Sequence, residues 1–190
     1  MKTLLLAIDI GNVCIHIDHK NFYRQLDIPE TTYGIKELIR DFEWGIIRDE
    51  DVFFDRLSTL LSGKFPHKKL QDAFAAILIR PVDGMSDLVS HLPAMGINAA
   101  FFSDISPFHL RCTQKMFPAF DSISRGAFSF NCGAWKPSEK MFSHFEELFG
   151  TPDLYTDDRS DLISGAKKHG WHAEQFVSAE DLYKKLTLLC

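Results

Sequence analysis

The chain has 190 residues, a length that fits one domain or one domain with a modest insertion. Hydrophobic residues make up 45% of it and charged residues 25%, as in an ordinary soluble globular protein, and no apolar run approaches membrane-spanning length. The net charge of −5, without any basic block, argues against nucleic acid as a partner.

The four cysteines show no paired spacing of the C-x-x-C kind. This predicts free thiols in a reducing cytoplasm, not a disulfide framework or a zinc site. The leucines after Met1 do not form a signal peptide, because Asp9 interrupts them too early and no cleavage site follows.

The first predicted element is a buried strand over residues 3–8, which ends at Asp9 and a turn containing Gly11 and Asn12. A strand that delivers a carboxylate onto a glycine-containing turn is a common way for α/β enzymes to present a nucleophile or a metal ligand. The ending of this strand therefore makes Asp9 the first candidate site residue.

The next segment lacks clear strands and predicts a helical insertion over residues 19–79, between a core formed by residues 1–18 and 80–190. Its best helix, over residues 49–62, should face inward with five residues: Phe53, Phe54, Leu57, Leu60 and Leu61. An insertion here would lie above the carboxyl ends of the strands, where ligands bind in such sheets. It is interpreted as a substrate lid, and the alternative is a decoration that only adds core.

The remainder alternates between strands and helices. Continuous apolar runs predict buried strands at 97–102, 154–156 and 173–177. Helical periodicity predicts helices at 86–95, 139–149, 160–169 and after Ser178. Pro93 should disturb the helix at 86–95. The alternation predicts an α/β fold, with a doubly wound parallel sheet and an inserted helical cap.

Three further polar pairs follow apolar runs or precede helices: Ser103-Asp104, Lys136-Pro137 and Asp157-Asp158. Phosphoryl transfer needs a nucleophile, a cation and fixed donors to the phosphoryl oxygens. Asp9 can serve as nucleophile and metal ligand, Ser103 offers a hydroxyl donor and Lys136 a positive charge. The adjacent acids Asp157 and Asp158 call for a cation between or beside them, which predicts Mg²⁺.

Four segments of the chain resemble the motifs of the haloacid dehalogenase-like (HAD) hydrolase superfamily: residues 7–13, 101–104, 133–137 and 155–158. The first motif, Asp-Ile-Gly-Asn-Val, is most similar to that of bacterial sugar-phosphate phosphatases of the glucose-1-phosphate phosphatase type. The stretch Phe42-Glu43-Trp44-Gly45 in the insertion also looks similar to theirs.

The resemblance implies a Mg²⁺-dependent phosphatase that forms an aspartyl-phosphate on Asp9. Ser103 and Lys136 would bind phosphate, with Asp104, Gly11 and Asn12 as further substrate-binding residues. Mg²⁺ would bind Asp9, the Gly11 carbonyl and Asp158, with Asp157 acting through water. The implied substrate is a small phosphorylated metabolite, a sugar phosphate in particular, with no nucleic acid or membrane as partner.

The sequence departs from the family at three positions. Gly11 stands where most of these phosphatases have a second aspartate, which acts as general acid and base. Leu162, beside Asp161, stands where the family usually has Asn or Asp. Asp104 stands where the family usually has Asn. Loss of the acid favours substrates with good leaving groups. His16 is a candidate substitute, although the simpler interpretation of it is a loop residue.

Two other functions compete with the phosphatase. One is a catalytically degenerate protein that binds a phosphorylated ligand or a protein partner, and the other is a dehalogenase of the same fold, against which the adjacent acids argue. Substrate contacts from the insertion are expected from Glu43 and Trp44 before Arg40, Arg48 or Arg80.

Overall fold

The computed structural model describes residues 3–123 and 125–189. Its central sheet has five parallel strands in the order β5-β4-β1-β6-β7. These strands are β1 (Leu4–Ile8), β4 (Ile97–Ser103), β5 (Gly126–Phe128), β6 (Leu154–Asp157) and β7 (Ala173–Gln175). The chain builds β4 and β5 on one side of β1 and then crosses to β6 and β7 on the other. The predicted doubly wound α/β fold is confirmed.

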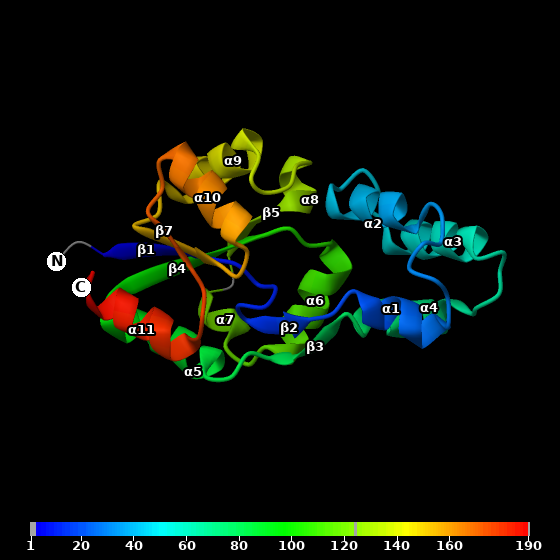
Figure 1. Cartoon of the computed structure of the whole chain (residues 1–190), viewed down its shortest axis with the longest axis horizontal. Coiled ribbons are helices and arrows are strands. Elements are labelled where there is room, and N and C mark those ends of the chain that lie inside the picture. The colour runs from blue at the N-terminus through cyan, green and yellow to red at the C-terminus, as the bar shows by residue number, and fades with distance from the viewer. Residues whose placement is uncertain (1–2, 124, 190) are drawn as a thin grey trace.

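Helices cover both faces of this sheet, because each central strand buries side chains in both directions. Along β1, Leu6 and Ile8 belong to one core, which is covered by α5 (Met85–His91), α7 (Phe120–Ile123) and α11 (Ala179–Thr187). Ala7, which points the other way, belongs to a second core under α9 (Glu139–Phe149) and α10 (Ser160–His169). Figure 1 shows α9 and α10 on one side of the sheet and α5 and α11 on the other. The alternation follows from the two-residue period of a strand.

Between β2 (Ile15–Ile17) and β3 (Leu78–Pro81) the chain forms four helices: α1 (Lys20–Leu26), α2 (Ile35–Glu43), α3 (Glu50–Leu60) and α4 (His67–Ala75). They extend from the end of the sheet toward which β1 and β4 run (Figure 1). They share a hydrophobic core rich in phenylalanine, in which the rings of Phe42 and Phe53 stack with their centroids 4.3 Å apart. The prediction that Leu60 faces inward is wrong, since 40% of it is exposed, whereas Phe53, Phe54 and Leu57 are buried as expected.

A two-stranded antiparallel ribbon of β2 and β3 joins these helices to the sheet. The helical prediction for the segment is wrong over Leu78 and Ile79, which belong to β3. The ribbon strands are too short for a periodic signal. For the same reason the sequence did not reveal β5, α7 or α8 (Ser129–Cys132), and α6 (Pro107–Met116) was not predicted either.

The disturbance expected at Pro93 is confirmed. The α5 helix ends at His91, and a 3₁₀ turn over Leu92–Met95 follows, closed by Gly96 at φ +72°. A proline lacks the N–H that the next turn of an α-helix requires.

Cys14, Cys112 and Cys132 are free thiols, as predicted, while Cys190 lies outside the described residues. Among the helices described, none combines the length and the apolar character needed to cross a bilayer.

Candidate active site

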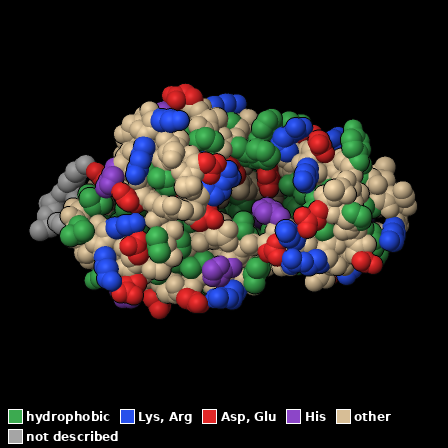
Figure 2. Space-filling model, viewed as in Figure 1, with side chains coloured by type: hydrophobic (Ala, Val, Ile, Leu, Met, Phe, Trp, Pro, Cys, Tyr) green, Lys and Arg blue, Asp and Glu red, His purple; other side chains and the backbone are tan. Residues whose placement is uncertain are grey.

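Three strands of the sheet end in polar side chains at the same edge. Asp9 follows β1, Ser103 ends β4 and Asp157 ends β6, and all three are buried. Because parallel strands present their carboxyl ends together, these groups meet where the direction of sheet building reverses. Asp9 and Ser103 line a cavity of about 730 Å³ there. Figure 2 shows a hollow in the middle of the molecule in which acidic, basic and histidine side chains gather.

Lys136 connects these strand ends. Its Nζ donates to Asp9 Oδ1 at 2.8 Å, to Asp157 Oδ2 at 2.6 Å and to the Phe102 carbonyl at 3.0 Å. Asp157 also accepts from the Tyr155 hydroxyl, and from the Arg159 backbone N–H at 2.9 Å. A buried ammonium with three acceptors is fully paired, which removes most of the penalty of burying its charge.

The charges around Lys136 shift several pKa values. Burial raises the pKa of Asp9 to about 7, with Lys136 opposing the rise. Burial acts on Asp157 in the same direction, but the Lys136 ammonium, together with the hydrogen bonds from Tyr155 and Arg159, outweighs it and lowers the pKa of that carboxyl. For Lys136 itself, the facing carboxylates overcome burial and hold its pKa well above the usual range. The site therefore keeps one firm positive charge between two carboxyls.

Asp158 completes a cluster with Asp9 and Asp157, in which one carboxylate oxygen of each lies within 4.8 Å of the others. Burial raises the pKa of Asp158 while a hydrogen bond from Asn12 Nδ2, at 3.0 Å, works against the rise. Asn12 has a positive φ of 52°, and its Oδ1 accepts from the Ile17 N–H at 3.1 Å. This side chain thus ties the turn after β1 to Asp158. Three carboxylates at these separations suit a hard divalent cation such as Mg²⁺.

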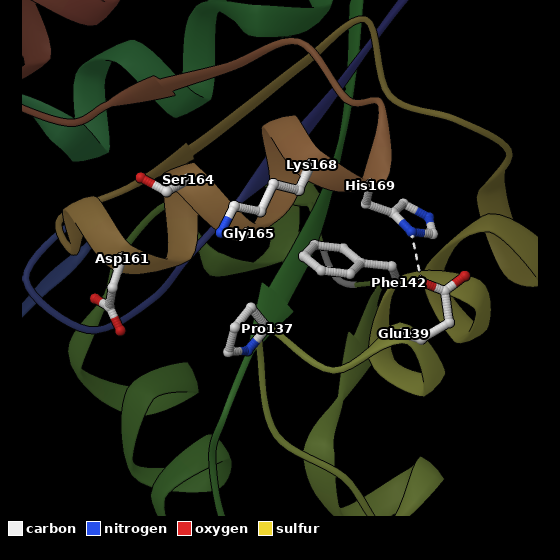
Figure 3. A pocket seen from close by; sticks show the side chains of 8 residues that line it. All are labelled: Pro137, Glu139, Phe142, Asp161, Ser164, Gly165, Lys168 and His169. Carbon is white, nitrogen blue, oxygen red and sulfur yellow. Dashed lines mark hydrogen bonds and ion pairs between the residues drawn. The ribbon is translucent and has the colours of Figure 1, made fainter.

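The loop that carries Lys136 is held from two sides. Asp104 Oδ1 accepts from the Lys136 backbone N–H at 3.0 Å. On the other side, Pro137 packs directly on α10 at Gly165, where an added Cβ would lie 2.4 Å from the proline Cβ. Figure 3 shows Pro137 and Gly165 in the lining of one pocket beside α9 and α10. A small residue at Gly165 is required for this close approach.

Gly11 lies beside the proposed nucleophile, since a Cβ on it would be 3.7 Å from Asp9 Oδ2. The same Cβ would be 3.0 Å from Ile17 Cδ1, so an apolar side chain fills the space that a larger residue at Gly11 would enter. His16 lies on β2, paired with Arg80 across the ribbon, and is not among the residues that line the cavity.

Several lining residues come from outside the predicted set. Ile17, His19, Trp135, Arg159 and Leu162 all line the cavity, as does Glu43 from the end of α2, which the sequence had singled out. Trp44 does not line it but packs edge-to-face on Trp135, with ring centroids 5.4 Å apart. The signal for Trp135 was its position before Lys136, whereas nothing in the sequence marked Ile17.

The fold is similar to the folds of several solved HAD enzymes. A HAD family enzyme from Bacteroides thetaiotaomicron matches with a TM-score of 0.80 and 20% sequence identity, over 93% of this chain and 94% of that one. A predicted HAD-like family hydrolase from Porphyromonas gingivalis matches with a TM-score of 0.81 and 20% identity, over 98% and 97% of the two chains. L-2-haloacid dehalogenase from Xanthobacter autotrophicus matches with a TM-score of 0.62 and 16% identity, over 98% and 83%.

The Bacteroides enzyme also matches in its complex with magnesium and inorganic phosphate, with a TM-score of 0.78 and 19% identity over 93% of this chain and 96% of that chain. No protein-family model and no curated protein matches the sequence.

Proposed function

We propose that the chain is a Mg²⁺-dependent phosphomonoester hydrolase that acts through an aspartyl-phosphate on Asp9. The observation that carries the proposal is the arrangement around Lys136, which joins Asp9 to Asp157 beside a cluster of three carboxylates. The fold shared with HAD enzymes supports it, and so does the complex of the Bacteroides enzyme with magnesium and inorganic phosphate.

In this mechanism one carboxylate oxygen of Asp9 attacks phosphorus while the leaving oxygen departs on the opposite side. The phosphoryl oxygens accept hydrogen bonds from the Ser103 hydroxyl, from the Lys136 ammonium and from backbone N–H groups at Asp104, Gly11 and Asn12. Mg²⁺ would be held by Asp9, Asp158 and the Gly11 carbonyl, with Asp157 acting through water, and it would supply charge that neutralises the phosphate.

We further propose residues 1–18 and 80–190 as the catalytic core and residues 19–79 as a cap that selects the substrate. The cavity is lined from both parts, by Glu43 of α2 as well as by the strand ends, which supports this division. A sugar phosphate is the proposed substrate, and the free thiols fit a reducing compartment such as the cytoplasm.

The test is hydrolysis of p-nitrophenyl phosphate and a panel of sugar phosphates, with Mg²⁺ or with EDTA. We expect metal-dependent turnover that Asp9→Asn abolishes, because an amide cannot act as the nucleophile. Asp83→Asn is the matched control, since it makes the same change at an exposed carboxylate paired with Arg80.

Two outcomes would reject the proposal. Release of halide from a 2-haloacid without phosphatase activity would identify a dehalogenase. Mg²⁺ binding without turnover of any phosphate ester would identify a binding protein on an enzyme's fold.

A further inference from the structure

The turn after β1 cannot supply the proton that a poor leaving group needs. Gly11 has no side chain, and Ile17 Cδ1 lies 3.0 Å from the place where a Cβ would start. An alkoxide leaving group without a proton donor departs slowly, typically by a factor of about 10²–10⁴. A donor has to come from another wall of the cavity.

Glu43 is the acidic residue that the helical segment contributes to the cavity wall. It is the last residue of α2 and lines both the site cavity and an adjoining cavity of about 400 Å³ between the helices. It therefore lies where substrate entering from the helical side meets the strand ends.

The backbone at Glu43 is fastened to the sheet. Ser129 Oγ donates to the Glu43 carbonyl at 2.7 Å and accepts from the Ile105 N–H, just beyond β4, at 3.0 Å. Two residues further, Gly45 approaches Phe130 so closely that a Cβ would lie 2.1 Å from the Phe130 carbonyl oxygen. These contacts hold the backbone at Glu43 against α8 and the segment that follows β4, at the wall of the site cavity.

The surroundings keep a proton on Glu43. Burial raises its pKa to about 8, and the nearby negative charge of Asp104 adds to the rise. Burial raises the pKa of Asp104 as well, but there the Lys136 ammonium opposes the rise. With a pKa of about 8, Glu43 holds a proton at neutral pH.

Other charged or titratable groups line the same two cavities: Asp9, Asp18, His19, Lys20, Tyr23, Glu30, Lys36, Arg40, Asp158 and Arg159. Asp18 is already engaged by a hydrogen bond from the Lys20 N–H and by Arg24, which lower its pKa. Desolvation lowers the pKa of His19 below its usual 6.5, so near pH 7 its imidazole carries no extra proton to donate.

We propose that Glu43 is the general acid and base of the phosphatase reaction, in the role left open at Gly11. The assignment rests on the proposed function. In the first half-reaction Asp9 bonds to phosphorus, the bond from phosphorus to the leaving oxygen breaks, and that oxygen takes the Glu43 proton and departs as an alcohol. In the second half-reaction the Glu43 carboxylate takes a proton from a water molecule, and the oxygen of that water attacks phosphorus. The bond between phosphorus and Asp9 breaks, which releases phosphate and restores the Asp9 carboxylate and the protonated Glu43.

The experiment compares wild type with Glu43→Gln on two substrates under saturating Mg²⁺. One is p-nitrophenyl phosphate, whose leaving group needs little protonation, and the other is an alkyl ester, glycerol 2-phosphate. We expect kcat/KM on the alkyl ester to fall by about 10²–10⁴ and kcat/KM on p-nitrophenyl phosphate to change little. Because the base is also lost, kcat on p-nitrophenyl phosphate should fall, with a burst of one nitrophenolate per enzyme.

The basic limb of the wild-type pH profile on the alkyl ester should disappear in the variant. Glu37→Gln, an exposed change on the same helix, serves as the matched control and should behave as wild type.

The outcomes separate this assignment from the proposed function. Equal loss of kcat/KM on both substrates, or no loss, would make Glu43 a structural residue and leave the phosphatase intact. Wild-type turnover of the aryl ester but not of the alkyl ester would show that no general acid operates. Absence of turnover on both esters would reject the phosphatase, and the role of Glu43 with it.

Discussion

At the scale of single residues, Lys136 decides the charge balance of the site. Its ammonium lies 2.8 Å from one buried carboxyl, Asp9, and 2.6 Å from another, Asp157. Neither acid has a second ion pair among the described residues. The two carboxyls are therefore compatible in one buried site because this one cation lies between them.

We expect Lys136→Met to lower the free energy of unfolding at pH 7 by about 3–5 kcal/mol, since removing one partner of a buried ion pair leaves its charge uncompensated. The difference in free energy of unfolding between variant and wild type should be smaller at pH 5, where the carboxyls of Asp9 and Asp157, without their cation, take up protons more readily. Urea denaturation at the two pH values measures both effects. Phosphatase activity should fall by at least about 100-fold, as for loss of a preorganised charge donor.

Lys140→Met is the matched control, because this exposed lysine at the start of α9 belongs to the same stretch of chain. A Lys136→Met protein as stable as the control at pH 7 would show that the two acids already share a proton without help from the lysine.

At the scale of elements, the contact between α2 and α8 fixes the helical segment against the sheet. Gly45 follows α2 with a φ of +68°, and its position would bring a Cβ to 2.1 Å from the Phe130 carbonyl oxygen of α8. Both the left-handed backbone and the lack of space demand glycine here. The close approach to Phe130, a tertiary contact, therefore adds to the requirement that the left-handed backbone already sets.

Gly63 allows the two reasons to be separated. It has the same φ of +68°, but a Cβ on it would meet nothing within 4 Å. We expect Gly63→Ala to lose about 1–2 kcal/mol of stability, the cost of a left-handed alanine. Gly45→Ala should lose clearly more and should also lower phosphatase activity, because α2 carries Glu43.

Urea denaturation and steady-state kinetics on the two alanine variants provide the measurement. Equal stability losses with equal activities would mean that the approach of α2 to α8 has no consequence beyond local backbone strain.

At the scale of the whole molecule, His109 joins the four helices between β2 and β3 to the rest of the chain. It lies on α6, beside the sheet, and its Nε2–H donates to the Phe74 carbonyl of α4 at 2.9 Å, while its ring packs on Phe74 with centroids 4.1 Å apart. Burial lowers the pKa of His109 from 6.5 to about 4, although the bond to Phe74 opposes this. The histidine is therefore neutral in the folded protein.

The sign of the resulting pH dependence follows from proton uptake. Below pH 6.5 the unfolded chain protonates this histidine whereas the folded chain does not, so stability is complete above 6.5 and declines as the pH falls toward 4. The two pKa values correspond to roughly 3 kcal/mol for this group. Between pH 6.5 and pH 4, the free energy of unfolding of His109→Gln should therefore fall by roughly 3 kcal/mol less than that of the wild type.

Chemical denaturation of both proteins at several pH values between 4 and 7 measures the difference between the two curves. Other titrating groups are common to both proteins and cancel in the comparison. Parallel curves would contradict the expectation and would mean that the histidine is protonated inside the fold.

The sequence by itself determined the layered fold and the order of the site residues. Continuous apolar runs, as in β1 and β4, follow from burial on both faces, and a polar residue at the end of such a run is visible in the sequence. Once the strands are parallel, their carboxyl ends must share an edge, so the approach of Asp9, Ser103 and Asp157 was predictable without coordinates.

Only the tertiary structure decided how that edge is completed. The place of Glu43 depends on contacts between residues more than 80 positions apart, such as Ser129 with the Glu43 carbonyl, and no local pattern encodes them. The filling of the space beside Gly11 by Ile17 likewise depends on the path of the ribbon, whose strands are too short to read from periodicity. Pairing and packing across such distances are set by the assembled cores, and for that reason they became visible only in the folded molecule.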